Sequence, residues 1–202
     1  MKYTAIVDYG VGNLKSVSNA LSYIGQHSKI TGDPKELELA DAIILPGVGA
    51  FPDAAEKLCA SGMDAALMAQ AQKKPILGIC LGMQMLFQRS CEVRPCDGLG
   101  FVSGTVERIN TKLKLPHIGW NSLKFHHHSP LFTGLDDGAY VYFVHSYCGV
   151  AEFPEQVIAT TDYGLPVVAA VQNGTIFGTQ FHPEKSGEVG LHILKNFGAL
   201  CR

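Results

Sequence analysis

The sequence predicts a single α/β domain over residues 1–202, with three layers: a mostly parallel central sheet, helices on both of its faces, and additional antiparallel strands in the C-terminal half. A length of 202 residues fits one domain, and 47% apolar against 17% charged residues can build a large core. In the first half, short apolar runs alternate with segments of helical periodicity, which is typical of parallel sheets. Beyond residue 98 the segments are shorter and separated by turns, which indicates strands, some of them antiparallel.

The first half contains three units in which an apolar run leads into a helix. The expected strands are the apolar runs at 3–7, 42–45 and 75–79, with a further short strand at 28–31. The third strand turns at once into a helix-forming segment at 81–87. The first helix should end near Gly25, which stands at the position of a C-cap. Apolar residues at helical spacing after the first two strands are Leu14, Val17, Leu21 and Ile24, and then Ala54, Leu58, Ala65, Leu67 and Met68.

The second half is expected to be built mainly from strands. The segments with strand composition are 100–109, 117–123, 139–144, 157–161, 167–171 and 175–180. An apolar stripe of Val189, Ile193, Phe197 and Leu200 follows, and its spacing predicts a closing helix that packs on the sheet.

Charge and cysteine content narrow the class of protein. The formal net charge is −2 with no basic run, which argues against nucleic acid as the main partner. No apolar stretch has the length of a membrane span, and the amino terminus has the pattern of a strand rather than a signal peptide. We therefore expect a cytoplasmic protein that keeps its six cysteines as reduced thiols and has no membrane contact.

A thiol stands at the sharpest local feature of the sequence. Gly78-Ile79-Cys80-Leu81-Gly82 lies between an expected buried strand and an expected helix, in the pattern of a nucleophile elbow. Such a turn presents the central side chain clear of the sheet, and the helix N-terminus favours a thiolate. The alternative is a buried structural cysteine in a glycine-rich turn.

A proton-handling pair follows the last expected strand. In His182-Pro183-Glu184 the imidazole can accept and return a proton while the carboxylate orients it. Pro183 favours an extended residue before it, so His182 and Glu184 can lie on the same side of the chain. Taken alone, this tripeptide is more often a surface turn, and it indicates catalysis only in combination with the cysteine turn.

A glycine-flanked loop could supply an oxyanion hole. Backbone N–H groups of Gly47, Val48 and Gly49 can turn toward a developing oxyanion, with a second donor from the N–H of Leu81. Together with the thiol and the histidine, this loop indicates acyl transfer, although by itself it also fits an ordinary strand-to-helix turn.

No cofactor or metal is expected. The Gly10-Val11-Gly12 loop lacks the third glycine and the spaced acidic residue of a dinucleotide fingerprint. The run of histidines at 126–128, with Cys91 and Cys96, raises the alternative of a zinc site, but the spacing does not suit one. A solvated loop is preferred for the histidine run.

The segments Gly-Ile-Cys-Leu-Gly-Met-Gln at 78–84 and Phe-His-Pro-Glu-Lys-Ser at 181–186 resemble the class I glutamine amidotransferases, which use a Cys-His-Glu triad. Four further segments, at 8–14, 45–51, 116–121 and 142–147, are similar to one branch of that family, the glutaminase subunits of imidazole glycerol phosphate synthase in histidine biosynthesis. The resemblance spans nearly the whole chain.

The resemblance implies a reaction and roles for particular residues. Cys80 would attack the side-chain amide of glutamine, His182 would protonate the departing ammonia, and water would hydrolyse the thioester to glutamate. Gln84, Ser146 and Tyr147 would contact the glutamine. The segment 47–49 would rearrange to form the oxyanion hole.

The family also implies a partner, a cyclase subunit with a (β/α)8 barrel that forms a heterodimer with the glutaminase and uses the ammonia to make imidazole glycerol phosphate and AICAR. The residues independently favour a partner, because the sheet and triad use up one domain and no phosphate loop remains. His117, Trp120 and Asn121 are the expected docking face, since an aromatic beside polar groups suits an interface; the alternative places the indole in the core.

Two other functions stay open at this point. One is a glutaminase subunit that serves another ammonia-using synthase, such as the pyridoxal phosphate or aminodeoxychorismate systems, and segment 116–121 argues against it. The other is a non-catalytic or redox-sensing protein of the same fold in which Cys80 is oxidised. The presence of both His182 and Glu184 argues against that function.

Overall fold

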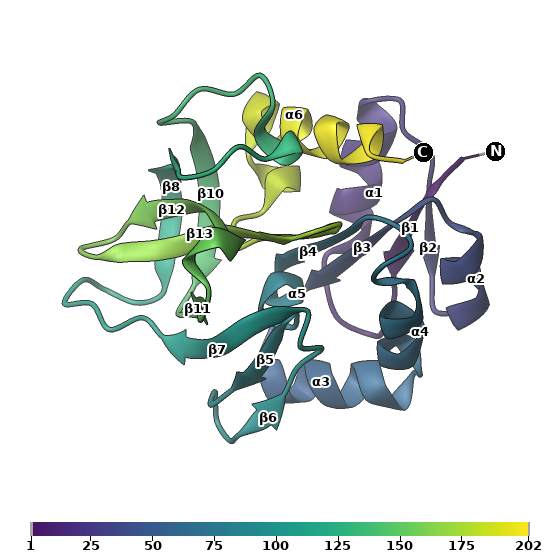
Figure 1. The fold of residues 1–202 in the computed structure, drawn as a ribbon, viewed down its shortest axis with the longest axis horizontal. Coiled ribbons are helices and arrows are strands. Elements are labelled where there is room, and N and C mark those ends of the chain that lie inside the picture. The colour runs from purple at the N-terminus through teal and green to yellow at the C-terminus, as the bar shows by residue number, and fades with distance from the viewer. Residues whose placement is uncertain (1, 202) are drawn as a thin grey trace.

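The computed structural model describes residues 2–201 and places the expected strands and helices in three layers (Figure 1). The helices are α1 (Leu14–Tyr23), α2 (Pro34–Leu39), α3 (Phe51–Ala60), α4 (Met63–Gln70), α5 (Leu81–Gln84) and α6 (Gly187–Ala199). The strands are β1 (Thr4–Val7), β2 (Ser28–Thr31), β3 (Ala42–Gly47), β4 (Ile76–Cys80), β5 (Phe87–Ser90), β6 (Cys96–Asp97), β7 (Val102–Arg108), β8 (His117–Ser122), β9 (Lys124–Phe125), β10 (Tyr140–His145), β11 (Tyr147–Ala151), β12 (Val157–Asp162), β13 (Pro166–Asn173) and β14 (Ile176–Thr179).

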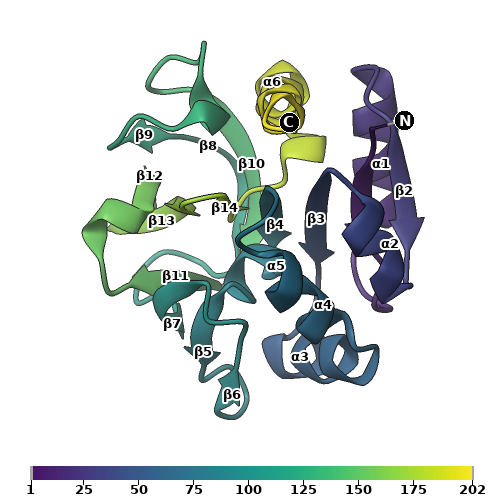
Figure 2. The same cartoon turned by 45° about the vertical axis from the view of Figure 1, so that its right-hand side comes forward.

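The central sheet has the order β2-β1-β3-β4-β14-β13-β12-β9 within the described residues. The five strands from β2 to β14 are parallel to their neighbours, and β13, β12 and β9 continue the sheet in antiparallel pairing. Figure 2 shows β4 between β3 and β14. Because parallel strands end at the same edge, the segments after β3, β4 and β14 come together there. The predicted fold class is confirmed.

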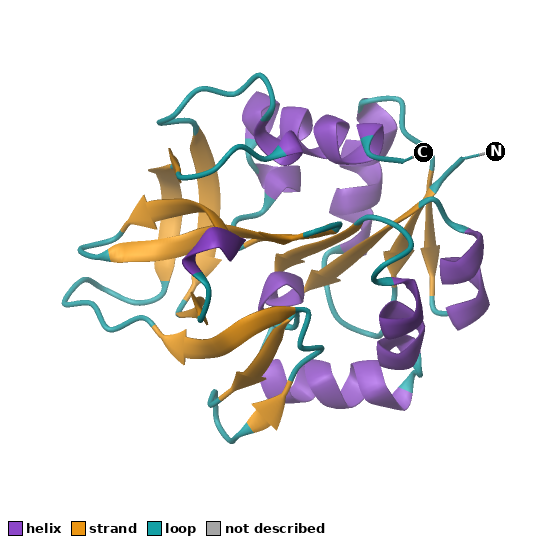
Figure 3. Ribbon diagram, viewed as in Figure 1, coloured by secondary structure: helices purple, strands orange, loops and turns teal. Residues whose placement is uncertain are grey.

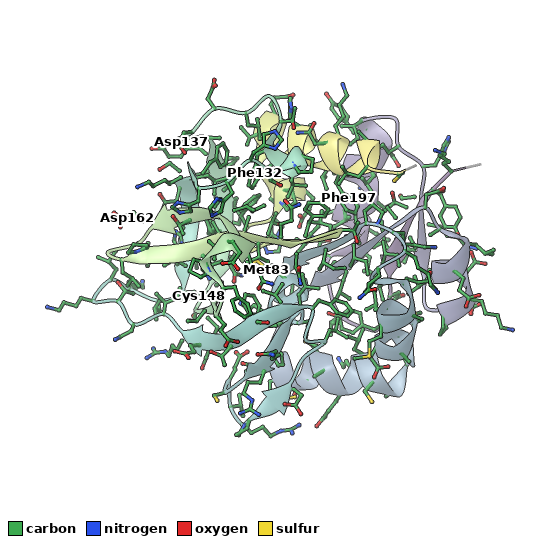
Figure 4. The ribbon with its side chains drawn as sticks, viewed as in Figure 1. Met83, Phe132, Asp137, Cys148, Asp162 and Phe197 are labelled. Carbon is green, nitrogen blue, oxygen red and sulfur yellow. The ribbon has the colours of Figure 1, made fainter. Side chains whose placement is uncertain are left out.

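Alternating residues of the parallel strands separate two cores. Ala5 and Val7 face the core shared with α2, α3, α4 and α5, whereas Ile6 faces the core shared with α1 and α6. Figure 1 shows these helices on opposite sides of the sheet. Met83 and Phe197, one from each core, lie on either side of it in Figure 4.

Two smaller sheets stand beside the central one at the end that carries the C-terminal half (Figure 3). Strand β10 pairs antiparallel with β8, and β11-β7-β5-β6 form the other sheet. The turn from β10 to β11 at Ser146 therefore joins the two small sheets. Both sheets lie close to the strand ends where Cys80 and His182 stand.

Several boundaries differ from the sequence predictions for identifiable reasons. Strand β3 continues through Pro46 to Gly47, because β4 extends beside it to Cys80. The helix expected at 81–87 ends at Gln84, and Phe87 begins β5 in parallel pairing with β7. Helices α3 and α4 are separate because Gly62 adopts a positive φ of 71° between them. Helix α2, with Asp33 as N-cap and Pro34 in its first turn, was not predicted.

Candidate functional site

Cys80 occupies a strained turn at the junction of β4 and α5. Its φ of 55° and ψ of −110° lie in a region that side chains rarely adopt. A Cβ at Gly78 would meet the backbone of Gly82 and Met83, and a Cβ at Gly82 would overlap the carbonyl oxygen of Leu45. The small residues two positions either side of the thiol therefore allow α5 to fold back tightly onto β3 and β4, in the geometry of a nucleophile elbow.

His182 and Glu184 form a buried pair in the segment that follows β14. The imidazole Nδ1 lies 2.8 Å from Glu184 Oε1, and the two side chains are 3% and 1% exposed. Two hydrogen bonds fix the backbone of His182. Its N–H donates to the carbonyl of Tyr142, and its carbonyl accepts from the side-chain hydroxyl of Ser186. Within residues 2–201, the imidazole Nε2 and the second oxygen of Glu184 have no hydrogen-bond partner.

The electrostatics of this pair favour the imidazolium. Burial by itself lowers the pKa of His182, but interactions with the Cys80 sulfur and the Glu184 carboxylate outweigh it and raise the pKa to about 9. At neutral pH His182 therefore carries a proton that it can deliver beside Cys80.

The glycine-flanked segment runs alongside the thiol. Gly47 pairs with Cys80 in the register of β3 and β4, and a Cβ there would crowd Tyr9, Gly82 and Leu81. The hydroxyl of Tyr9 donates to the carbonyl of Pro46 at 2.9 Å and so holds the end of β3. Val48 is 43% exposed, and Gly49 has a φ of 105° with open space around it. This segment is anchored at Gly47 and open to solvent beyond it.

A cavity of about 410 Å³ joins these groups. It is lined by most of the residues expected in catalysis, in the oxyanion hole and in glutamine contact, namely Cys80, His182, Val48, Gly49, Leu81, Gln84, Ser146 and Tyr147. Gly47 and Glu184 do not line the cavity themselves. Gly47 precedes the lining residue Val48, and Glu184 contacts the lining residue His182. Sequence reasoning did not single out Glu92, His145 or Lys185, which also line the cavity. Glu92 accepts a hydrogen bond from the N–H of Phe51 at 2.8 Å, at the first turn of α3.

Two buried carboxamides connect the cavity wall to the sulfur. Gln84 Nε2 donates to the carbonyl of Tyr147 at 2.9 Å and to Gln180 Oε1 at 3.1 Å. Gln180 Nε2 in turn lies 3.9 Å from Cys80 Sγ, within the range of a hydrogen bond to sulfur. Gln180 was missed from sequence because it ends a strand segment and its position next to Cys80 depends on the pairing of β14 with β4.

The three residues expected on a docking face lie in different environments. Trp120 is 54% exposed and contacts Tyr142 edge-on, so its indole is not in the core. Asn121 is half-buried. His117 is 2% exposed and stacks between Phe143 and Tyr163, with ring centroids 4.7 and 3.9 Å away. His117 was expected on a docking surface, but it is buried. Alternate residues of β8 point inward, and His117 is one of them.

Other features considered from sequence form no second site of the kinds expected. Within the described part of the chain all six cysteines are free thiols. No cluster of three or more His, Cys, Asp or Glu in residues 2–201 is arranged to hold a metal ion. His126 instead contacts the hydroxyl of Thr160 at 2.8 Å. None of the helices in these residues is long and apolar enough to cross a membrane.

Comparisons with known proteins agree with this geometry. The profile of the family described as glutamine amidotransferase class-I matches residues 5–200. A protein of Bacillus cereus named imidazole glycerol phosphate synthase subunit HisH is 49% identical over 195 residues, which are 96% of this chain and 92% of that protein. The protein of the same name from Oceanobacillus iheyensis is 48% identical over 200 residues, covering 98% and 99% of the two chains.

A solved structure gives the same answer for the fold. One chain in a solved structure described as PurLQS from Thermotoga maritima superposes on this chain with a TM-score of 0.77 at 20% identity, and the match covers 98% of each of the two chains. The sequence matches extend from the first strand to the last helix and include the elbow and the His-Pro-Glu segment. This chain therefore belongs to the class-I glutamine amidotransferase family.

Proposed function

We propose that this chain is the glutaminase subunit of imidazole glycerol phosphate synthase, which hydrolyses glutamine and passes the ammonia to a cyclase in histidine biosynthesis. The observation that carries the glutaminase chemistry is that Cys80 and His182 line the same cavity while the buried Glu184 contacts the imidazole of His182. The relatives named HisH, similar over more than nine tenths of each chain, support the choice of this synthase.

The proposed reaction begins with the Cys80 thiolate, which attacks the side-chain carbonyl carbon of glutamine. The carbonyl oxygen becomes an oxyanion, and the N–H of Leu81 stands ready because the first N–H groups of a helix have no intrahelical acceptor. When the C–N bond breaks, the proton on His182 goes to the leaving nitrogen and ammonia departs. His182 then takes a proton from water, whose oxygen attacks the thioester, and glutamate and the thiolate are released.

The cavity offers matched groups for the two ends of an amino acid. Glu92 and Lys185 are its charged lining residues besides His182. We assign Glu92 to the α-ammonium of glutamine and Lys185 to the α-carboxylate. Both amide hydrogens of Gln84 are used, so its Oε1 remains to accept a hydrogen bond from the substrate, with Ser146 and Tyr147 beside it. Gly47, Val48 and Gly49 complete the oxyanion hole after the segment turns its N–H groups inward.

A partner is part of the proposal, because ammonia released into water at neutral pH is mostly protonated and no longer a nucleophile. The proposed partner is a (β/α)8-barrel cyclase in the cytoplasm, bound as a heterodimer. The exposed aliphatic and aromatic side chains of Ile118, Trp120 and Tyr140 on β8 and β10 are the proposed docking surface. An exposed apolar cluster of this kind is typical of protein interaction sites.

A steady-state glutaminase assay tests the proposal. We expect slow turnover by the isolated chain and a sharp rise when the cyclase and its ribonucleotide ligand are added. Cys80→Ala should abolish turnover, whereas Cys148→Ala, at another buried cysteine, should retain it. Equal rates with and without the cyclase would contradict the coupling, and activity in Cys80→Ala would contradict the nucleophile. Co-purification with the cyclase separates this synthase from other ammonia-using ones.

A further inference from the structure

A second set of buried polar groups meets the active-site carboxamides at a single backbone oxygen. The carbonyl of Tyr147, which accepts from Gln84 Nε2, also lies 2.8 Å from His145 Nδ1. His145 Nε2 lies 3.2 Å from Nδ1 of His117. His117 Nε2 lies 3.4 Å from the side-chain nitrogen of Asn121. A continuous series of hydrogen bonds therefore links strand β8 to the carboxamides beside Cys80.

The direction of every hydrogen bond in this series follows from the Tyr147 carbonyl, which can only accept. His145 must carry its proton on Nδ1, so its Nε2 accepts from Nδ1 of His117. On the other side, Gln84 must present its NH2 group to the carbonyl. Its second hydrogen then points to Gln180 Oε1, and this orients the NH2 of Gln180 toward the Cys80 sulfur.

The far end of the series is fixed in the same way. Asn121 Oδ1 accepts from the N–H of Ser122 at 2.8 Å, and its Nδ2 donates to the carbonyl of Asp162 at 2.8 Å. The amide of Asn121 therefore cannot flip, and it presents a donor to His117 Nε2. Backbone groups thus set the polarity of the series at both ends.

The two imidazoles are held as neutral, oriented rings. His117 and His145 are 2% and 6% exposed, and Phe143 and Tyr163 stack on His117. Burial lowers the pKa of His117, and it lowers that of His145 to about 4, so both rings are uncharged at neutral pH. A neutral imidazole with one donor and one acceptor is the form that the series requires.

The series begins on the inner face of a strand whose outer face is open. His117 and Asn121 point inward from β8, whereas Ile118 and Trp120 are 58% and 54% exposed on the other side. The register of β8 with β10 sets His117 opposite His145. A shift of β8 would therefore reach the Tyr147 carbonyl through the hydrogen bonds of His117 and His145.

We infer that His117 and His145 are positioning residues for glutamine hydrolysis: through the Tyr147 carbonyl they orient the carboxamides of Gln84 and Gln180 at Cys80. The inference rests on the proposed glutaminase function and deepens it. Neither imidazole reacts. His117 holds the His145 ring, and the Nδ1–H of His145 holds the Tyr147 carbonyl in place. That carbonyl in turn fixes the position of Gln84 and, through it, of the Gln180 NH2 group at the sulfur.

Three variants of β10 test the role of His145. His145→Leu removes the donor to Tyr147 and should lower kcat/KM for glutamine about 10- to 100-fold, the range expected when catalytic groups are misplaced. His145→Asn places an amide N–H close to the position of Nδ1 and should recover activity to within about three-fold of wild type. Val141→Ala perturbs a fully buried residue of the same strand and should stay within about three-fold.

A double-mutant cycle asks whether His145 acts through Gln180. If it does, His145→Leu in a Gln180→Leu background should reduce kcat/KM by less than about three-fold, because the link is already broken. If His145→Leu does not fold, His117→Phe carries the test, since it keeps the stacked ring and removes the donor. Its kcat/KM should then fall at least about three-fold, and wild-type activity in this variant would overturn the inference.

The inference is overturned by fully additive losses in the cycle, by failure of His145→Asn to recover, or by equal losses in His145→Leu and Val141→Ala. All variants are compared by basal glutamine hydrolysis of the isolated chain and again with the cyclase and its ribonucleotide. Basal hydrolysis by the isolated chain tests the positioning role, and stimulation by the cyclase tests the proposed partner. The positioning role and the partner proposal can therefore fail independently of each other.

Discussion

Cys80 combines a chemical requirement with a backbone cost. Its φ of 55° and ψ of −110° present the sulfur to the cavity, but this conformation is unfavourable for any residue with a Cβ. We expect Cys80→Gly to raise the free energy of unfolding by about 1 kcal/mol over Cys80→Ala, after allowing for the greater flexibility of unfolded glycine. Urea denaturation of the two inactive variants measures the difference. A less stable glycine variant would show that the turn stores no strain.

His182 gives the stability of the fold a definite pH dependence. Its folded pKa of about 9 lies above the ordinary value of 6.5, so the folded state holds the proton more tightly than the unfolded state. The resulting stabilisation is complete below about pH 6.5 and is lost as pH rises through about 9.

Removing the Glu184 carboxylate, which helps to hold the proton on His182, should weaken the pH dependence of the free energy of unfolding. Glu184→Gln is expected to reduce the fall in the free energy of unfolding between pH 6.5 and 9, because the carboxylate is one cause of the raised pKa. Denaturant titrations across this range measure the slope. Glu188→Gln, at an exposed acid in the first turn of α6, should keep the wild-type slope. An unchanged slope in Glu184→Gln would contradict the assignment.

Single residues also show what a sequence can and cannot predict about a site. Cys80, His182 and Glu184 were predicted together because each stands in a short motif with its own mechanistic logic. Gln180 and His145 have no such motif: their contacts depend on the pairing of β14 with β4 and of β10 with β8. Residues whose role arises from strand register are visible only after the sheet is assembled.

At the level of elements, the turn from β4 to α5 works only because its backbone passes very close to β3. A Cβ at Gly82 would overlap the Leu45 carbonyl, which lies on a fully buried strand and cannot move away. We expect Gly82→Ala to lower the free energy of unfolding by at least about 3 kcal/mol.

Gly25→Ala is the matched control for this prediction. Gly25 follows the C-terminal end of α1 and has a φ of 75°, but nothing lies within 4 Å of a Cβ built there. Backbone strain alone should cost about 1 kcal/mol at this position. Urea denaturation compares the two variants, and equal losses would show that close approach is not what requires glycine at 82.

The predicted elements were most accurate where apolar periodicity was strong and least accurate where partners determine structure. Strand 28–31 and the helix after the first strand were located by pattern alone. The segment 81–87 has helix-forming residues, yet the helix ends at Gln84 because Phe87 pairs with β7. Tertiary pairing overrode local propensity there, as it did when β3 was extended to Gly47.

On the scale of the whole molecule, the site lies where three parallel strands end and two small sheets meet. The central sheet supplies Cys80 and the oxyanion segment, and the chain leaving β14 supplies His182. Strands β10 and β11 supply Ser146 and Tyr147 at their junction. Since β8 pairs with β10, a protein that docks on β8 contacts an element joined directly to the substrate cavity.

Trp120 is the residue of that surface most suited to dominate docking energy. It is large, 54% exposed, and flanked by the exposed Ile118 of the same strand. Trp120→Ala is therefore expected to weaken binding to the cyclase by about 2 kcal/mol, or about 30-fold in Kd. Isothermal titration calorimetry measures this change directly.

Leu39→Ala is the control for the docking surface. Leu39 is 70% exposed on α2, at the opposite end of the molecule from β8 in Figure 1, and its removal should leave Kd unchanged. At saturating cyclase the glutaminase rate of Trp120→Ala should recover toward wild type, because Trp120 contributes to affinity rather than to the chemistry at Cys80. Equal Kd values for Trp120→Ala and wild type would place the cyclase on another face, and the link from β8 to Tyr147 would then have no partner to act on it.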